Sequence, residues 1–131
     1  MSVFGAIQIS ASGLTAQSYR MDVIAQNIAN AETTRTENGT PYQRRSVVLA
    51  EQPAGRSFAD VMNQTQSAGG VSVVGTEADT SPFEMVYNPA HPDADADGYV
   101  SMPNVDLTQE YVDLISASRS YEANLTVLNA T

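Results

Sequence analysis

The first part of the chain carries apolar and small side chains at heptad spacing. Large residues recur every seven positions, with a small residue four positions after each of the first three: Ile7, Ala11, Leu14, Ser18, Met21, Ala25 and Ile28. This 4-3 repeat predicts a helix, spanning residues 6–30, that forms one side of a coiled coil. Because large and small residues alternate along the repeat, a second helix can approach closely. Gly13 weakens this helix locally, by about 1 kcal/mol relative to alanine.

The end of the chain repeats the pattern with larger residues: Leu107, Tyr111, Leu114, Ser118, Tyr121, Leu125 and Leu128. A second helix is therefore expected over residues 106–131. Asp106 and Gln109 fit a capping box, in which each side chain satisfies a backbone N–H of the first turn. The acidic residues Glu110 and Asp113 also suit the positive end of the helix dipole. All six prolines lie between these two segments, which leaves both free to be helical.

The middle of the chain alternates apolar with other residues, as strands with one buried face do. Candidate strands contain Val71 and Val73, then Phe83, Met85 and Tyr87, with further ones at Val47 and Leu49 and at Tyr99–Met102. The stretch from about 52 to 70, rich in Gly, Ser, Ala and Gln, predicts a flexible surface loop. The predicted fold class is α+β, with N- and C-terminal coiled-coil-forming helices packed together and a small central, mostly β unit between them. The expected regions are 1–33, 34–105 and 106–131.

Two arrangements of these helices remain open from periodicity alone. In one, they pair within a monomer as an antiparallel hairpin beside a sheet. In the other, they pack against copies of themselves and against related chains, forming the core of a filament. Intramolecular pairing is plausible because most helical stripes bury their apolar side within one domain. Periodicity by itself still does not decide between the two arrangements.

The charge balance of the 131 residues is strongly acidic, with 15 Asp and Glu against 6 basic residues and a net charge of -9. This disfavours binding to nucleic acids or to anionic membrane surfaces, which both need basic residues. Between Ser57 and Ser118 no basic residue occurs. If the chain assembles, that acidic stretch is expected either to face outward or to meet a basic partner. No apolar run is long enough to insert into a membrane or to act as a cleavable signal peptide.

Few residues offer catalytic or metal-binding chemistry. The chain has no cysteine and one histidine, His91, which lies between prolines and is expected in a solvated loop. Residues 93–98 (Asp-Ala-Asp-Ala-Asp-Gly) match the opening of a calcium loop, but Asn104 stands where the closing Glu is needed. We interpret them as an exposed acidic turn. No catalytic residue, metal site or cofactor is predicted, and a calcium-responsive module or a carboxylate-based hydrolase acting on the cell wall remain as alternatives.

Two N-terminal segments, Ser10–Gln17 and Met21–Asn30, resemble the signature of bacterial flagellar rod and hook proteins. Further segments resemble the proximal rod members of that family: 70–75, 81–83, 86–89, 91–95, 98–100, 102–106, 116–124 and 127–129. The resemblance implies a structural subunit of the flagellar basal-body rod, the drive shaft that transmits torque and encloses the export channel. It implies no enzyme activity. It further implies that both heptad rows are axial packing positions at subunit interfaces.

The same resemblance implies partners and a location. The partners are copies of the chain itself, rod proteins of the FlgB, FlgF and FlgG kinds, the FliE adaptor, the FliF ring and the flagellar type III export apparatus. The location is the rod in the periplasmic space, reached by export without a cleaved signal peptide. Family members continue for further helical turns, which implies that the C-terminal helix is truncated here.

Overall fold

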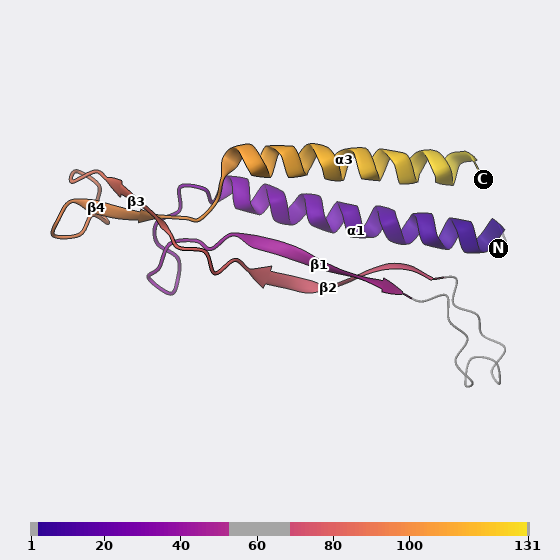
Figure 1. The fold of residues 1–131 in the computed structure, drawn as a ribbon, viewed down its shortest axis with the longest axis horizontal. Helices are drawn as coiled ribbons and strands as arrows, with labels where there is room; N and C mark the ends of the chain where they lie inside the picture. Colours follow the sequence, from indigo (N-terminus) through magenta and orange to yellow (C-terminus); the bar gives the residue numbers. More distant parts are fainter. Residues whose placement is uncertain (1–2, 53–68, 131) are drawn as a thin grey trace, which may run out of the picture.

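The computed structural model describes residues 3–52 and 69–130. In chain order the elements are α1 (Val3–Ala29), β1 (Arg45–Gln52), β2 (Gly70–Ala78), β3 (Glu84–Tyr87), β4 (Tyr99–Met102) and α3 (Leu107–Ala130). The α+β class is confirmed, since two long terminal helices flank short antiparallel strands (Figure 1). The predicted loop at 52–70 lies almost entirely outside the described residues. Among the described helices, none is both long and apolar enough to cross a membrane.

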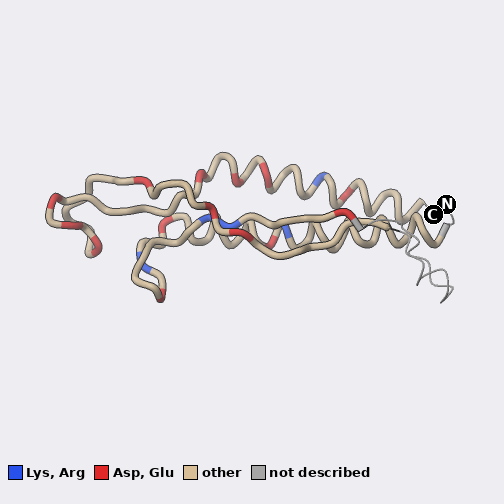
Figure 2. The backbone as a smooth tube through the Cα atoms, turned by 60° about the horizontal axis from the view of Figure 1, so that its bottom comes forward, with Lys and Arg blue, Asp and Glu red and all other residues tan. Residues whose placement is uncertain are grey.

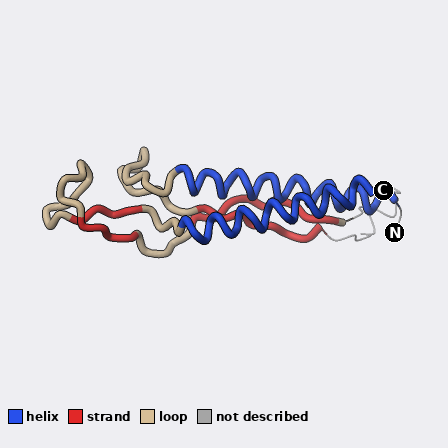
Figure 3. The backbone as a smooth tube through the Cα atoms, turned by 90° about the horizontal axis from the view of Figure 1, so that it is seen from above, coloured by secondary structure: helices blue, strands red, loops and turns tan. Residues whose placement is uncertain are grey.

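The two helices lie side by side and antiparallel, with both chain termini at the same end (Figures 1 and 3). The helices are 27 and 24 residues long, or about 40 and 36 Å. The first of the two arrangements left open by the sequence, an antiparallel hairpin within one monomer, is therefore present in the isolated chain.

Small and polar residues let the helices approach closely. A Cβ atom built on Gly13 would lie 2.8 Å from the side-chain amide of Asn124, so any larger residue must displace that amide. Among the described helices and strands, α3 packs only on α1, and its two buried residues, Glu110 and Ala117, therefore face α1. Gly13 therefore does more than lower the helix propensity of α1, because its lack of a side chain lets α3 approach closely.

The strands β1 and β2 form an antiparallel ribbon that runs along α1, on the side away from α3 (Figure 1). The register shifts between Val48 and Leu49, as at a β-bulge. The ribbon is tied to the helix by the Ser12 hydroxyl, which accepts a hydrogen bond from Val71 N–H at 3.1 Å and donates to Ile9 C=O at 2.7 Å. α1 is consequently held between α3 and the ribbon.

The strands β3 and β4 form a separate hairpin that extends beyond the end of the helices (Figures 1 and 3). Gly98 precedes β4 at φ 86° and lies against the ring of Tyr87, which packs edge-on against Tyr99 at 5.3 Å between ring centroids. Both strands were predicted, but the buried face expected for the segment from Phe83 to Tyr87 was wrong, because all four residues of β3 are exposed. The buried side chain of this strand pair is instead Val100 in β4, which is 1% exposed.

Candidate functional site

A fully buried asparagine joins α1 to three other segments. The Asn27 amide nitrogen donates to Arg45 C=O at 2.7 Å and to Glu110 Oε2 at 3.2 Å. Its oxygen accepts from the Tyr42 hydroxyl at 2.7 Å and from Arg45 N–H at 3.0 Å. Asn27 thereby pairs with both backbone groups of Arg45, as a neighbouring strand would. All of its hydrogen-bonding capacity is used, which is what a side chain with no solvent exposure requires.

Glu110 is also fully buried, and Arg44 is its counter-charge. The Arg44 guanidinium bonds Glu110 Oε1 through Nε and lies 3.6 Å from carboxylate oxygens of both Asp79 and Asp113. Burial by itself would lower the pKa of Arg44. The hydrogen bond to Glu110 and the three negative charges outweigh it and hold that pKa above its usual value. One cation thus links α3 to the ends of β1 and β2.

Asn104 completes this cluster from the segment that leads into α3. Its oxygen accepts from Arg44 N–H at 2.7 Å, and its nitrogen donates to the carbonyls of Asp79 and Ser81, both at 3.0 Å. We call Asn27, Tyr42, Arg44, Asn104 and Glu110 the polar junction. It fixes both helices and the β1–β2 ribbon at the end where the β3–β4 hairpin begins.

The acidic stretch of the sequence is partly neutralised within the chain. Asp79, Glu110 and Asp113 meet Arg44, and Asp93 meets Arg35 at 2.8 Å. Figure 2 shows acidic positions along the helices and the β3–β4 extension, with basic positions near some of them. Four acidic residues of this stretch are thus paired with arginines of the same chain, and whether the stretch faces outward or meets a basic partner on assembly stays a prediction.

The calcium-like segment contributes its carboxylates to the fold. The Thr34 hydroxyl donates to Asp93 Oδ2 at 2.6 Å, and this bond, assisted by Arg35 against the cost of desolvation, lowers the pKa of Asp93. Asp95 Oδ1 accepts from the backbone N–H of Asp97 and Tyr99, both at 2.9 Å. Within the described ranges, no three acidic or histidine side chains gather as metal ligands would.

None of the fourteen predicted packing residues is buried in the isolated chain. On α1 the large members Ile7, Leu14, Met21 and Ile28 are half-buried, and the small members Ala11, Ser18 and Ala25 are exposed. On α3, Leu107, Tyr111 and Leu125 are exposed, whereas Leu114, Ser118, Tyr121 and Leu128 are half-buried. We call these fourteen residues the seam. The helix–helix contact also includes small and polar residues outside the seam, at Gly13 against Asn124 and at Asn27 against Glu110.

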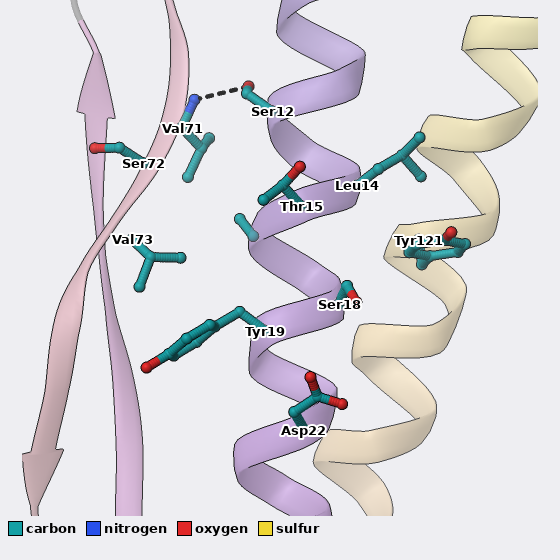
Figure 4. A pocket seen from close by; sticks show the side chains of 11 residues that line it. Ser12, Leu14, Thr15, Ser18, Tyr19, Asp22, Val71, Ser72, Val73 and Tyr121 are labelled. Carbon is teal, nitrogen blue, oxygen red and sulfur yellow. Dashed lines mark hydrogen bonds between the residues drawn. The ribbon is translucent and has the colours of Figure 1, made fainter.

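The two halves of the seam meet on one flank of the helix pair. Leu14 and Ser18 from α1 and Tyr121 from α3 line the same open groove, of about 760 Å³ (Figure 4). Across α1, the groove continues to Val71 and Val73 of β2. The structure therefore brings together predicted residues from both helices without burying them.

The cap of α3 forms through Asp106 alone. Asp106 Oδ1 accepts from the backbone N–H of Thr108 at 3.0 Å and of Gln109 at 3.4 Å. The Gln109 side chain reaches forward to Asp113 at 2.9 Å, and not back to the Asp106 backbone. The predicted bond from the Gln109 side chain back to the Asp106 backbone N–H is therefore wrong. The Asp113 carboxylate, one turn along the helix, accepts from Gln109 instead.

The polar junction was not predicted from the sequence. Glu110 was expected only to suit the positive end of the helix dipole, and no role was predicted for Asn27. A signal was present: Gly13 and Asn27 are fourteen residues apart, as are Glu110 and Asn124. This spacing places each pair in a second heptad row of small and polar residues beside the apolar one.

Comparison with known proteins places the chain among flagellar proteins. Residues 7–35 match the family described as "Flagella basal body rod protein", and residues 96–131 match "Flagellar basal body rod FlgEFG protein C-terminal". These two matches cover α1 from residue 7 onward and all of α3, and so include the whole of the seam.

Curated relatives extend the similarity over the full chain. The flagellar basal-body rod protein FlgC of Bacillus subtilis is 48% identical, covering 100% of this chain and 92% of the relative. The FlgC proteins of Borreliella burgdorferi and Salmonella typhimurium are 44% and 42% identical, covering 100% and 98% of this chain and 91% and 90% of the relatives. On this full-length similarity, the chain belongs to the FlgC family of flagellar basal-body rod proteins.

Proposed function

We propose that this chain, as a structural component of the rod, assembles through the seam of its α1–α3 hairpin into the drive shaft that transmits torque and encloses the export channel. The observation that carries the proposal is that every seam residue stays half-buried or exposed although the helices are already paired. The second arrangement of the sequence analysis, packing against other subunits, then adds to the intramolecular pairing and does not replace it.

The energetics of the seam suit repeated contacts between subunits. Leu107, Tyr111 and Leu125 are 41, 51 and 39% exposed. Full burial of such a side chain contributes about 1.5–3 kcal/mol, so covering the exposed part of each contributes about 1 kcal/mol. Contacts of this size are modest singly and add up along a helix. The small residues Ala11, Ser18 and Ala25 let a neighbouring helix approach α1 closely. Rigidity of the shaft then comes from many such contacts, with no chemical step.

The proposed neighbours are further copies of the chain, rod proteins of the FlgB, FlgF and FlgG kinds, the FliE adaptor and the FliF ring. The proposed location is the part of the basal body that crosses the periplasm, reached through the flagellar type III export apparatus without a cleaved signal peptide. Family membership supports assembly with basal-body components, and the acidic charge disfavours nucleic acids and membranes as partners.

We also infer that the chain has no catalytic activity. Its relatives carry the name of rod proteins. The lone histidine, His91, accepts a hydrogen bond through Nδ1 from Asp93 N–H at 3.0 Å within a turn. Two carboxylates of the calcium-like segment have partners within the fold: Asp93 bonds to Thr34 and Arg35, and Asp95 to backbone amides. No observation favours the hydrolase or the calcium-responsive module.

The test compares two substitutions on α3 in a bacterium that lacks its own FlgC and is complemented by this chain. Leu125→Asp places a charge in the seam. Val112→Asp places the same charge at a 55% exposed position, which the 3.6-residue repeat puts on the far side of the helix. We expect Leu125→Asp to abolish swimming and rod incorporation, because burying an unpaired carboxylate at a subunit contact is costly.

The matched Val112→Asp variant should assemble and swim. Both variants should keep the helical content of the isolated chain, since both positions are at least 39% exposed. Normal rod incorporation of Leu125→Asp would contradict the assignment of the seam to subunit contacts.

A further inference from the structure

A second groove lies where the helices end and the β3–β4 hairpin begins. It has a volume of about 560 Å³, and its apolar lining includes Val86, Met102 and Leu107. Val86 and Leu107 are 39 and 41% exposed, and Met102 is half-buried. The groove is continuous with the proposed assembly surface, because Leu107 is also the first seam residue of α3.

The rim of this groove is acidic and contains no basic residue. Glu32, Glu84 and Asp106 line it and are all exposed. Within the described part of the chain, Glu32 and Glu84 form no ion pair, whereas Asp79, Asp93, Glu110 and Asp113 each have an arginine partner. The N-terminus of α3 adds only about half a positive charge, and Asp106 already caps it. The electrostatic potential in the groove is therefore negative.

The adjacent hairpin offers a strand edge as well as apolar side chains. Among the described strands, β3 and β4 pair only with each other. Asp95 bonds both the backbone N–H and the C=O of Tyr99 in β4, so the edge that matters here is that of β3, whose four side chains are all exposed. A two-stranded hairpin is marginally stable alone and gains from a covering segment. An extended peptide can add to such an edge through backbone hydrogen bonds, with its side chains entering neighbouring pockets.

We propose that this groove docks an extended segment of a different protein chain, one that combines apolar side chains with Lys or Arg. The apolar residues of that segment lie against Val86, Met102 and Leu107, and its cations pair with Glu32 and Glu84. A second copy of this chain is disfavoured as the occupant because each copy has a net charge of -9. This inference depends on the proposed function in one respect only, namely that docking takes place within the assembled rod.

The experiment is photo-cross-linking in bacteria that assemble their basal bodies with the full-length chain. One strain carries a photo-reactive amino acid at position 86, in the groove, and a second carries it at position 125, in the seam. Mass spectrometry identifies the cross-linked peptide. We expect position 86 to link to a different protein, within a segment that contains apolar residues and Lys or Arg.

Variants test the role of the rim. Glu32→Gln with Glu84→Gln should lower the cross-linking yield at position 86 at least fivefold. The matched pair Glu51→Gln with Glu77→Gln, at exposed positions on the β1–β2 ribbon, should leave it unchanged. An equal yield in both double variants would overturn the charge pairing.

The other possible cross-linking results overturn the proposal. A cross-link from position 86 to another copy of the chain, to an acidic segment, or to nothing overturns the proposal. If position 125 still links to neighbouring subunits in that case, the proposed rod function stands without the groove. If neither position links, both inferences fail.

Discussion

Replacing Arg44 with methionine tests whether the buried Glu110 carboxylate depends on a single counter-charge. Glu110 has no solvent exposure, and its partners are Arg44 and the Asn27 amide. In Arg44→Met the carboxylate keeps one neutral donor and no cation. Methionine retains much of the volume of the arginine stem, so the effect reports mainly on charge and not on a cavity.

The magnitude follows from the difference between buried and exposed ion pairs. Removing one partner of a buried pair costs about 3–5 kcal/mol. Asp79 and Asp113 lose the same partner, but both reach solvent and add little. The matched control is Arg35→Met, which breaks an ion pair whose arginine side chain is 70% exposed and should cost about 0–1 kcal/mol. A domain of this kind has a total stability of about 5–15 kcal/mol, so only the first loss is severe.

Urea unfolding followed by far-ultraviolet circular dichroism measures both losses. With a slope of about 1–3 kcal/mol per molar urea, Arg44→Met should lower the midpoint by about 2 M, and Arg35→Met by about 0.5 M at most. Adding Glu110→Gln to Arg44→Met should restore part of the loss, because a neutral amide is cheaper to bury than an unpaired carboxylate. Equal losses for the two arginine variants, or no recovery in the double variant, would refute this account of the junction.

Three further predictions concern the hydrogen bonds and packing of the same fold. Burial, together with Glu110 and against Arg45, raises the pKa of Tyr42 above its usual value of 10.0. The hydroxyl therefore stabilises the fold fully below pH 10: Tyr42→Phe should cost about 1 kcal/mol at pH 7, and its deficit against wild type in urea unfolding should shrink as the pH rises through the folded pKa. For Asp93, the Thr34 hydroxyl and Arg35 lower the pKa below 3.8, so its stabilising effect is present above that value and is lost as the pH falls through the folded pKa. Asp93→Asn should accordingly be less stable than wild type in thermal melts at pH 6, and the gap should narrow below pH 3.8. Gly13→Ala should destabilise the helix pair because the new Cβ would lie 2.8 Å from the Asn124 amide. Adding Asn124→Ala should recover stability and reveal the gain of about 1 kcal/mol that alanine brings in helix propensity. No recovery in thermal melts would contradict the proposed contact.

Elements that form through interactions between residues close in sequence could be predicted, and contacts between distant residues could not. The heptad spacing placed the two helices to within three residues of their observed ends, because periodicity and the absence of proline act locally. All four strands were also anticipated. Their pairing was not, because β1 joins β2 across residues 53–68 and β3 joins β4 separately. The fourteen seam residues were identified as packing positions, and whether they contact neighbouring subunits stays a prediction.

The sequence by itself determined the two amphipathic helices, the short strands, the acidic balance and the resemblance to rod proteins, since each depends on nearby residues or on composition. Only the tertiary structure decided which helix face is used within the chain. The contact between Asn27 and Glu110 joins residues 83 positions apart and depends on the antiparallel register of the helices. Likewise, Arg44 becomes the counter-charge of the buried Glu110 only when both strand ends and α3 converge on it. Small and polar side chains occur in that interface because they permit close approach and can be fully hydrogen-bonded, and the large apolar seam residues beside them stay half-buried or exposed.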